Sequence, residues 1–185
     1  MRRPDTPVRV PYERQVFINC PYDDDYRPLL KAAAFAVHAC GFRARLALED
    51  VGARQGRLER LTAIIADCGL AIHDISRVEV DSKSALPRFN MAFECGVYFG
   101  ASRFGTGRQR RKDYLLLDAV PDRHRRTLSD LSGVDPRIHR NEPERMIRCV
   151  RDFLATKTER RPAGPAELVT LFRAFNADLP ARAAG

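Results

Sequence analysis

The sequence predicts an α/β fold, a doubly wound sheet of about five mainly parallel strands with helices on both faces. Short apolar runs alternate with amphipathic stretches at a spacing of about thirty residues, which is typical of β-α units around a parallel sheet. The chain has 185 residues, a length that fits one domain. Hydrophobic residues make up 44% of it and charged residues 30%, which favours a soluble globular protein over a disordered one.

The first half of the chain supplies three expected strands. An apolar run that ends at the breaker residues 20–25 predicts the first strand, and apolar side chains at helical spacing follow it. Asp25 can cap this helix, and Gly41 ends it. Alternation of apolar and polar side chains indicates the second strand, and a polar loop leads to the second helix. The expected elements are strand 15–19, helix 26–40, strand 42–48, helix 57–68 and strand 70–75.

The second half continues the alternation and completes a flavodoxin-like arrangement. Residues 76–88 are polar and without period, so they are expected to form a loop. The remaining elements are helix 89–101, strand 114–117, a short strand 137–139, helix 142–157, the linker 160–165 and a final helix around 168–175. We therefore expect an N-terminal arm over 1–14, one domain over 15–158, and a linker with a C-terminal helix over 159–185.

Composition limits the cellular setting. The chain has five cysteines, an odd number, without a C-x-x-C motif or a closely paired histidine. This argues against a disulfide scaffold or a zinc site and predicts reduced thiols in the cytoplasm. No apolar run approaches the roughly 20 residues of a membrane helix, and no apolar core follows residues 1–5 as in a secretory signal. We expect neither a metal nor contact with a membrane.

Positive charge is concentrated late in the chain. The net charge is +8, and residues 102–185 hold eighteen basic and eleven acidic side chains. Such stretches attract phosphate-rich partners by counterion release, which leaves nucleic acid open as a partner. Solvated arginines on loops and helix faces explain the same pattern. No helix-turn-helix spacing or aromatic interleaving accompanies the arginines, so DNA binding ranks below the functions that follow.

Polar side chains collect where the predicted strands end. Parallel α/β sheets bind ligands beyond the carboxyl ends of their strands, where the strand order reverses. Glu94 lies in a helix that is otherwise apolar or small, where an ionised carboxylate is costly unless it faces a polar cleft. Burial would raise its pKa, and the nearby helix N-terminus would lower it. A partly exposed glutamate at the rim of the helix explains the same pattern equally well. The candidate residues are Asn19, Cys20, Pro21, Tyr22, Asp74, Arg77, Arg88, Asn90 and, as the catalytic group, Glu94.

Other chemical groups near these ends have simpler interpretations. His73 lies within an apolar strand, which favours a hydrogen-bonded structural histidine. Cys20 has no suggestive partner and is expected to be a small packing residue. The acids 23–25 could hold a divalent ion, but a helix cap with two solvated neighbours is favoured. Residues 49–50 could touch a ribose hydroxyl or be loop acids.

Three segments carry a family resemblance. Phe17-Ile18-Asn19-Cys20-Pro21-Tyr22-Asp23, Ile72-His73-Asp74-Ile75-Ser76-Arg77 and Arg88-Phe89-Asn90-Met91-Ala92-Phe93-Glu94-Cys95-Gly96 resemble a bacterial family of TIR-like proteins related to nucleoside 2-deoxyribosyltransferases. The similarity spans 15–117. The deoxyribosyltransferase pattern Asp-x-Gly-Thr-Ala-x-Glu-x-Gly is matched at Ala92, Glu94 and Gly96. The resemblance implies that Glu94 is the catalytic glutamate, that the loop after the first strand binds substrate, and that Asp74 lines the same pocket.

The chain also departs from this pattern. Arg88 stands at the place of the aspartate, and Asn90-Met91 at the place of Gly-Thr. An arginine fork binds phosphate, which the replaced aspartate would repel, so a nucleotide or dinucleotide is expected as substrate. Many TIR-like relatives cleave the nicotinamide–ribose bond of NAD, often in bacterial defence against phage. A neutral pyridine leaves without a strong acid, so one carboxylate would suffice; a nucleobase would more often need Asp74 or His73 as proton donor.

Two classes of function therefore remain. The first is an NAD glycohydrolase-like enzyme, or alternatively a nucleoside 2-deoxyribosyltransferase-like enzyme, which uses NAD or another nucleotide as substrate and needs no cofactor. The second is a non-catalytic nucleotide-sensing or assembly module. Because TIR-like domains commonly mediate assembly, the resemblance also implies a homo-oligomer or an assembly activated by a partner.

Overall fold

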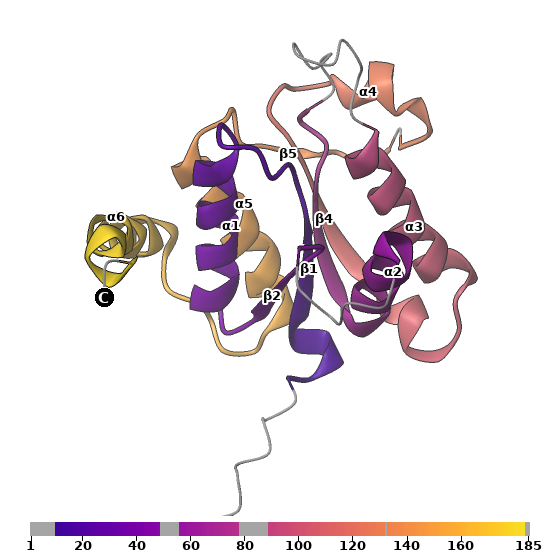
Figure 1. Cartoon of the computed structure of the whole chain (residues 1–185), viewed down its shortest axis with the longest axis horizontal. Coiled ribbons are helices and arrows are strands. Elements are labelled where there is room, and N and C mark those ends of the chain that lie inside the picture. Colours follow the sequence, from indigo (N-terminus) through magenta and orange to yellow (C-terminus); the bar gives the residue numbers. More distant parts are fainter. Residues whose placement is uncertain (1–9, 49–55, 78–88, 132, 184–185) are drawn as a thin grey trace, which may run out of the picture.

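A computed structural model describes residues 10–48, 56–77, 89–131 and 133–183, with only the backbone of 180–183. It contains the predicted α/β architecture, with a five-stranded sheet of order β2-β1-β3-β4-β5 (Figure 1). Every pairing in this sheet is parallel. The strands are β1 Gln15–Asn19, β2 Arg43–Leu46, β3 Leu70–Asp74, β4 Asp113–Asp118 and β5 Arg137–Ile138. This confirms the flavodoxin-like, doubly wound fold.

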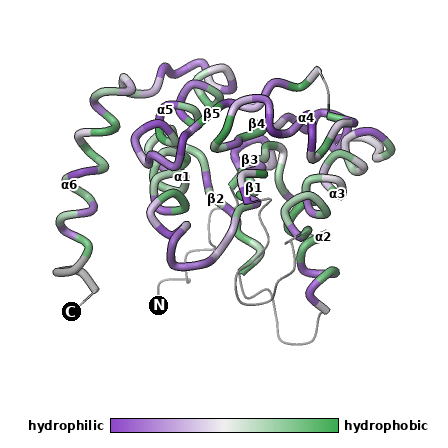
Figure 2. The backbone as a smooth tube through the Cα atoms, turned by 90° about the horizontal axis from the view of Figure 1, so that it is seen from above, coloured by the Kyte–Doolittle hydropathy of each residue, from purple (hydrophilic) through white to green (hydrophobic). Residues whose placement is uncertain are grey.

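Helices cover both faces of the sheet (Figures 1 and 2). One face carries α1 (Arg27–Ala39) and α5 (Pro143–Leu154), with α6 (Pro165–Ala183) outside them. The other face carries α2 (Arg57–Asp67) and α3 (Asn90–Phe104). The short α4 (His124–Thr127) follows β4. Because the chain leaves β1 towards β2 and then crosses back to β3, the strand order reverses between β1 and β3.

The core follows the two-residue period of the strands. Side chains such as Val16, Ile18 and Ile72 pack with α1, α5 and α6 in one cluster. Phe17 and Ala71 point to the opposite face and pack with α2 and α3. Both faces of the sheet are therefore buried, as parallel sheets require.

The C-terminal helix shares the main core. Leu168, Val169 and Phe172 of α6 are buried in the same cluster as α1 and α5. Arg151 of α5 donates from Nε to the carbonyl of Ala163, at 3.0 Å, just before α6 begins. The segment after residue 158 is thus packed onto the domain. None of the helices in the described part of the chain is both long and apolar enough to cross a membrane.

Several details differ from the sequence-based expectation. Asp23, rather than Asp25, accepts the hydrogen bond from the Tyr26 N–H, at 3.0 Å, because a turn separates the acids from α1. Helix α3 runs on to Phe104 and ends at Gly105, where an added Cβ would lie 2.2 Å from the Ala101 carbonyl oxygen. Unpredicted short helical segments occur at Tyr12–Arg14, Gly107–Arg111, His124–Thr127 and Ser129–Leu131.

Lys112 stabilises the C-terminal end of α2. Its Nζ is buried and donates to the carbonyls of Ile65, at 2.6 Å, and Cys68. Lys112→Met is expected to lower the free energy of unfolding by about 2–3 kcal/mol, because both buried carbonyls lose their donor. Chemical denaturation measures this loss, and Lys31→Met, at an exposed position of α1, is the control. Equal stability of the two variants would contradict the role given to Lys112.

Candidate functional site

A cleft of about 450 Å³ opens at the carboxyl edge of the sheet, where the strand order reverses between β1 and β3. Its walls come from the loop after β1, the residues after β3, and the first turns of α2 and α3. We call it the Glu94 cleft. The lining residues are Pro21, Tyr22, Asp23, Arg57, Arg77, Asn90, Met91 and Glu94.

Glu94 lies one turn into α3 and is 5% exposed. Burial raises the pKa of its carboxyl group, and this effect outweighs the opposite effect of Arg57. Such a carboxylate is poorly solvated when ionised, and a positive charge developing beside it would be strongly attracted. The side chain can therefore act as a nucleophile or stabilise a cationic centre.

Arg57→Gln is expected to raise the pKa of Glu94 further, because Arg57 counteracts the effect of burial on that carboxyl group. A nuclear magnetic resonance titration of the glutamate carboxyl carbons measures the shift. Arg43→Gln is the matched control, since Arg43 is exposed and lies at the opposite, amino end of β2. An identical titration of Glu94 in both variants would show that Arg57 does not act on it.

Arg77 and Asp23 form an ion pair on the wall of the cleft. Arg77 Nη2 lies 3.3 Å from Asp23 Oδ1, and the two side chains are 41% and 28% exposed. Ion pairs with this much solvent contact are weak. An anionic ligand could therefore replace Asp23 as the partner of the Arg77 guanidinium with little loss of free energy.

Tyr22 fixes the loop after β1 against the end of β2. Its hydroxyl oxygen accepts a hydrogen bond from the Ala47 N–H at 3.2 Å. Burial raises the pKa of this phenol above its ordinary value. The half-buried ring thus offers the cleft a flat, uncharged wall.

Two predicted binding residues, Asn19 and Cys20, lie beneath the cleft rather than on its wall. Asn19 is fully buried; its Nδ2 donates to the Met91 carbonyl at 2.8 Å and lies 3.1 Å from His73 Nδ1. It thereby joins β1, β3 and the start of α3. Cys20 is also buried, and burial raises its thiol pKa well above the ordinary value. Neither side chain lines the cleft, so direct substrate binding by either residue stays a prediction.

His73 is enclosed by aromatic rings. Phe17, Tyr98, Phe99 and Tyr114 surround its imidazole, with ring centroids 5.1–6.5 Å away. Burial, with a smaller effect of the Lys112 charge, lowers its pKa to about 3. The imidazole is neutral near pH 7 and does not line the cleft, which disfavours its alternative role as a proton donor. Its packing and hydrogen bond agree with the structural role.

Asp74 forms a buried polar network and is not among the side chains that line the cleft, so the substrate-binding role implied by the resemblance stays a prediction. The Tyr26 hydroxyl donates to its Oδ2, the Ser76 N–H donates to Oδ1 at 2.8 Å, and His139 Nε2 lies 3.0 Å from Oδ2. Burial alone would raise the pKa of Asp74, but His139, Tyr26 and Ser76 together hold it below its ordinary value. An ionised, fully engaged carboxylate cannot supply a proton to a leaving group.

The remaining predicted residues divide into two groups. Pro21, Tyr22, Arg77, Asn90 and Glu94 meet at the cleft. Arg88 and the acids 49–50 lie outside the described residues. Arg57 was not predicted, although it opens the helix that follows β2 and so lies at the same sheet edge.

The acids at 23–25 take separate structural roles. Asp23 accepts hydrogen bonds from Tyr26 and Arg77, and Asp24 pairs with Arg27. Within the ranges that the structure describes, no group of three His, Cys, Asp or Glu side chains is placed to hold a metal ion. Comparison of the chain with protein-family models, with curated proteins and with solved structures finds no match in any of the three.

Proposed function

We propose that this chain cleaves the N-glycosidic bond of a nucleotide and that NAD is its substrate. The observation that carries the proposal is the Glu94 carboxyl group, which lines a cleft at the reversal point of the sheet and has a raised pKa. The resemblance to TIR-like proteins adds a role as an effector or signal-producing enzyme in bacterial defence against phage.

In this reaction the bond between ribose C1′ and the pyridinium nitrogen breaks. Its electron pair goes to the nitrogen, which leaves as neutral nicotinamide, and positive charge develops at C1′. Glu94 stabilises that charge or attacks C1′, and water then adds to C1′ and loses a proton. The products are nicotinamide, ADP-ribose and a proton.

The surroundings of Glu94 favour a leaving group that needs no proton. Asp74 and His73 lie outside the cleft, and Asp23 accepts hydrogen bonds from Arg77 and Tyr26. A nucleobase that leaves as an anion would need a donor that these residues do not supply. A pyridinium carries its own positive charge, so this chemistry fits a single carboxylate.

Arginines at the cleft support a phosphorylated substrate. Two arginines line the cleft from different elements: Arg57 begins α2, and Arg77 follows β3. Guanidinium groups bind phosphate through paired N–H donors. A nucleotide is therefore favoured over a free nucleoside.

Nicotinamide release from NAD by the purified protein tests the proposal. The assay compares the wild type, Glu94→Gln and the control Glu167→Gln, whose glutamate is exposed on α6. Release by the wild type and the control, but not by Glu94→Gln, supports the enzyme. Rising protein concentrations test whether activity depends on self-assembly. Tight NAD binding without turnover would contradict catalysis and favour a nucleotide sensor.

A further inference from the structure

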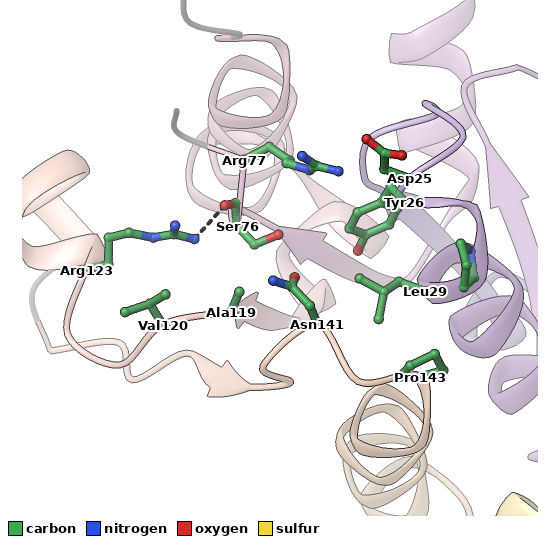
Figure 3. A pocket seen from close by; sticks show the side chains of 11 residues that line it. Asp25, Tyr26, Leu29, Ser76, Arg77, Ala119, Val120, Arg123, Asn141 and Pro143 are labelled. Carbon is green, nitrogen blue, oxygen red and sulfur yellow. Dashed lines mark hydrogen bonds between the residues drawn. The ribbon is translucent and has the colours of Figure 1, made fainter. Parts of the chain in front are cut away.

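A second pocket, of about 480 Å³, shares Arg77 with the Glu94 cleft. Figure 3 shows the side chains that line it. It is formed by residues that follow β3 and β4 and by the first turns of α1 and α5. We call it the Ser76 pocket. Arg77 lines both spaces and therefore lies between them, so an extended ligand that occupied both would run along this side chain.

Ser76 provides the strongest sign of a ligand. The residue is 4% exposed, and its Oγ has no hydrogen-bond partner among the residues that the structure describes. Its backbone N–H is already bound to Asp74. A buried hydroxyl without a partner costs about 1–3 kcal/mol. Figure 3 shows the side chains of Ser76 and Asn141 turned into the same space, so a ligand acceptor there would satisfy the Ser76 hydroxyl and could also accept from the exposed Asn141 amide.

The electrostatic setting favours an anion. Arg77 and Arg123 line the pocket, and the Arg123 guanidinium is held in place by the Ser76 carbonyl and the buried Asp118 carboxylate. The N-terminal turns of α1 and α5 also border it, and the positive ends of helix dipoles attract anions. Three carboxylates oppose these arginines: Asp118 pairs with Arg123, Asp23 pairs with Arg77 in a solvent-exposed contact, and Asp25 is exposed at the rim.

We infer that the Ser76 pocket binds the phosphate groups of the substrate, with the Ser76 hydroxyl and the Asn141 amide as hydrogen-bond donors and Arg77 between the phosphates and Glu94. This inference rests on the proposed function and specifies its substrate as a nucleotide with a diphosphate rather than a nucleoside. A phosphate group accepts several hydrogen bonds at once, which matches the several polar side chains that line the Ser76 pocket.

Two substitutions remove these donors without disturbing the fold. Ser76→Ala deletes only the unpartnered hydroxyl, so the melting temperature is expected to stay unchanged or to rise. Asn141 has φ +58°, a left-handed conformation that glycine adopts without strain, so Asn141→Gly is the suitable change. Asn176→Ala, at an exposed position on α6, is the control.

The kinetic test compares NAD with nicotinamide riboside, which has the same glycosidic bond but no phosphate. For Ser76→Ala and Asn141→Gly, KM for NAD is expected to rise about tenfold each, the equivalent of 1.4 kcal/mol, while KM for the riboside stays unchanged. An unchanged KM for NAD, or equal increases for both substrates, would overturn the inference while leaving the glycosidase intact.

A binding test separates the inference from the proposed function. Calorimetry with inorganic pyrophosphate is carried out on the wild type, on Glu94→Gln and on the Ser76→Ala/Asn141→Gly double variant. Binding to the first two, with at least a tenfold loss in the double variant, supports the pocket even if no NAD is cleaved. Equal binding by all three proteins, or binding by none, would overturn it.

Discussion

Glu94→Gln is expected to reduce nicotinamide release from NAD by about a thousandfold or more. Removing a group that stabilises charge only in the transition state typically costs ~10²–10³ in kcat, and removing a nucleophile costs more. Glutamine keeps the size of the side chain but can neither attack C1′ nor neutralise positive charge. The loss should therefore fall on kcat, with KM for NAD little changed.

The same substitution is expected to stabilise the protein near neutral pH. The folded-state pKa of Glu94 is raised by burial, so ionisation favours the unfolded state as the pH rises through that pKa. Melting temperatures at about pH 8 should be higher for Glu94→Gln than for the wild type, and the difference should vanish at about pH 4, below the ordinary glutamate pKa. If Glu94→Gln melted below the wild type at both pH values, its lost activity would be explained by a destabilised fold.

Asp74→Ala is expected to lower the free energy of unfolding by about 3–5 kcal/mol, the cost of breaking a buried charged network from one side. Tyr26 and His139 would each lose the buried carboxylate that they contact. Urea denaturation measures the loss, and Asp130→Ala, at an exposed site, is the control. A normally folded Asp74→Ala variant with a raised KM would instead support the pocket-lining role implied by the resemblance.

The pH dependence of this stability has a definite sign. Because the folded-state pKa of Asp74 is lowered, its contribution is fully present above the ordinary aspartate pKa of about 3.9 and is lost as the pH falls through the folded-state value. Asp74→Asn should flatten this acid-induced loss of stability. If the free energy of unfolding fell equally steeply with decreasing pH in the wild type and in Asp74→Asn, an ionised Asp74 in this network would be contradicted.

The regular elements of this fold could be predicted because their patterns are long enough to repeat. The strand predicted at 15–19 agrees with β1, and the strand predicted at 70–75 agrees with β3 to within one residue. Segments of three to five residues, such as Tyr12–Arg14 and Gly107–Arg111, are shorter than two helical turns and show no period. Their conformations are set by contacts with distant residues, as between the Tyr12 hydroxyl and the Arg108 carbonyl.

The candidate site was only partly predictable for a related reason. The sequence indicates which residues reach the carboxyl edge, and Tyr22, Arg77 and Glu94 do meet there. It does not indicate which way a side chain turns at the end of a strand, so Asn19 and Asp74 were predicted to bind substrate although both are buried. Ser76 falls in the predicted loop 76–88, and nothing in the local sequence marks a hydroxyl that lacks a partner.

The hydrogen bond from Asn19 to the Met91 carbonyl makes the position of Glu94 independent of the side chains that would select a ligand. The start of α3, and with it Glu94, is anchored by the hydrogen bond from the buried Asn19 amide to the Met91 carbonyl, whereas Tyr22, Arg57 and Asn90 line the cleft from a loop and from first helical turns. Substitutions at Tyr22, Arg57 or Asn90 can therefore alter ligand choice without displacing the reactive carboxylate. A scaffold of this kind lends itself to diversification, and a library randomised at those three positions is a practical starting point for redirecting specificity.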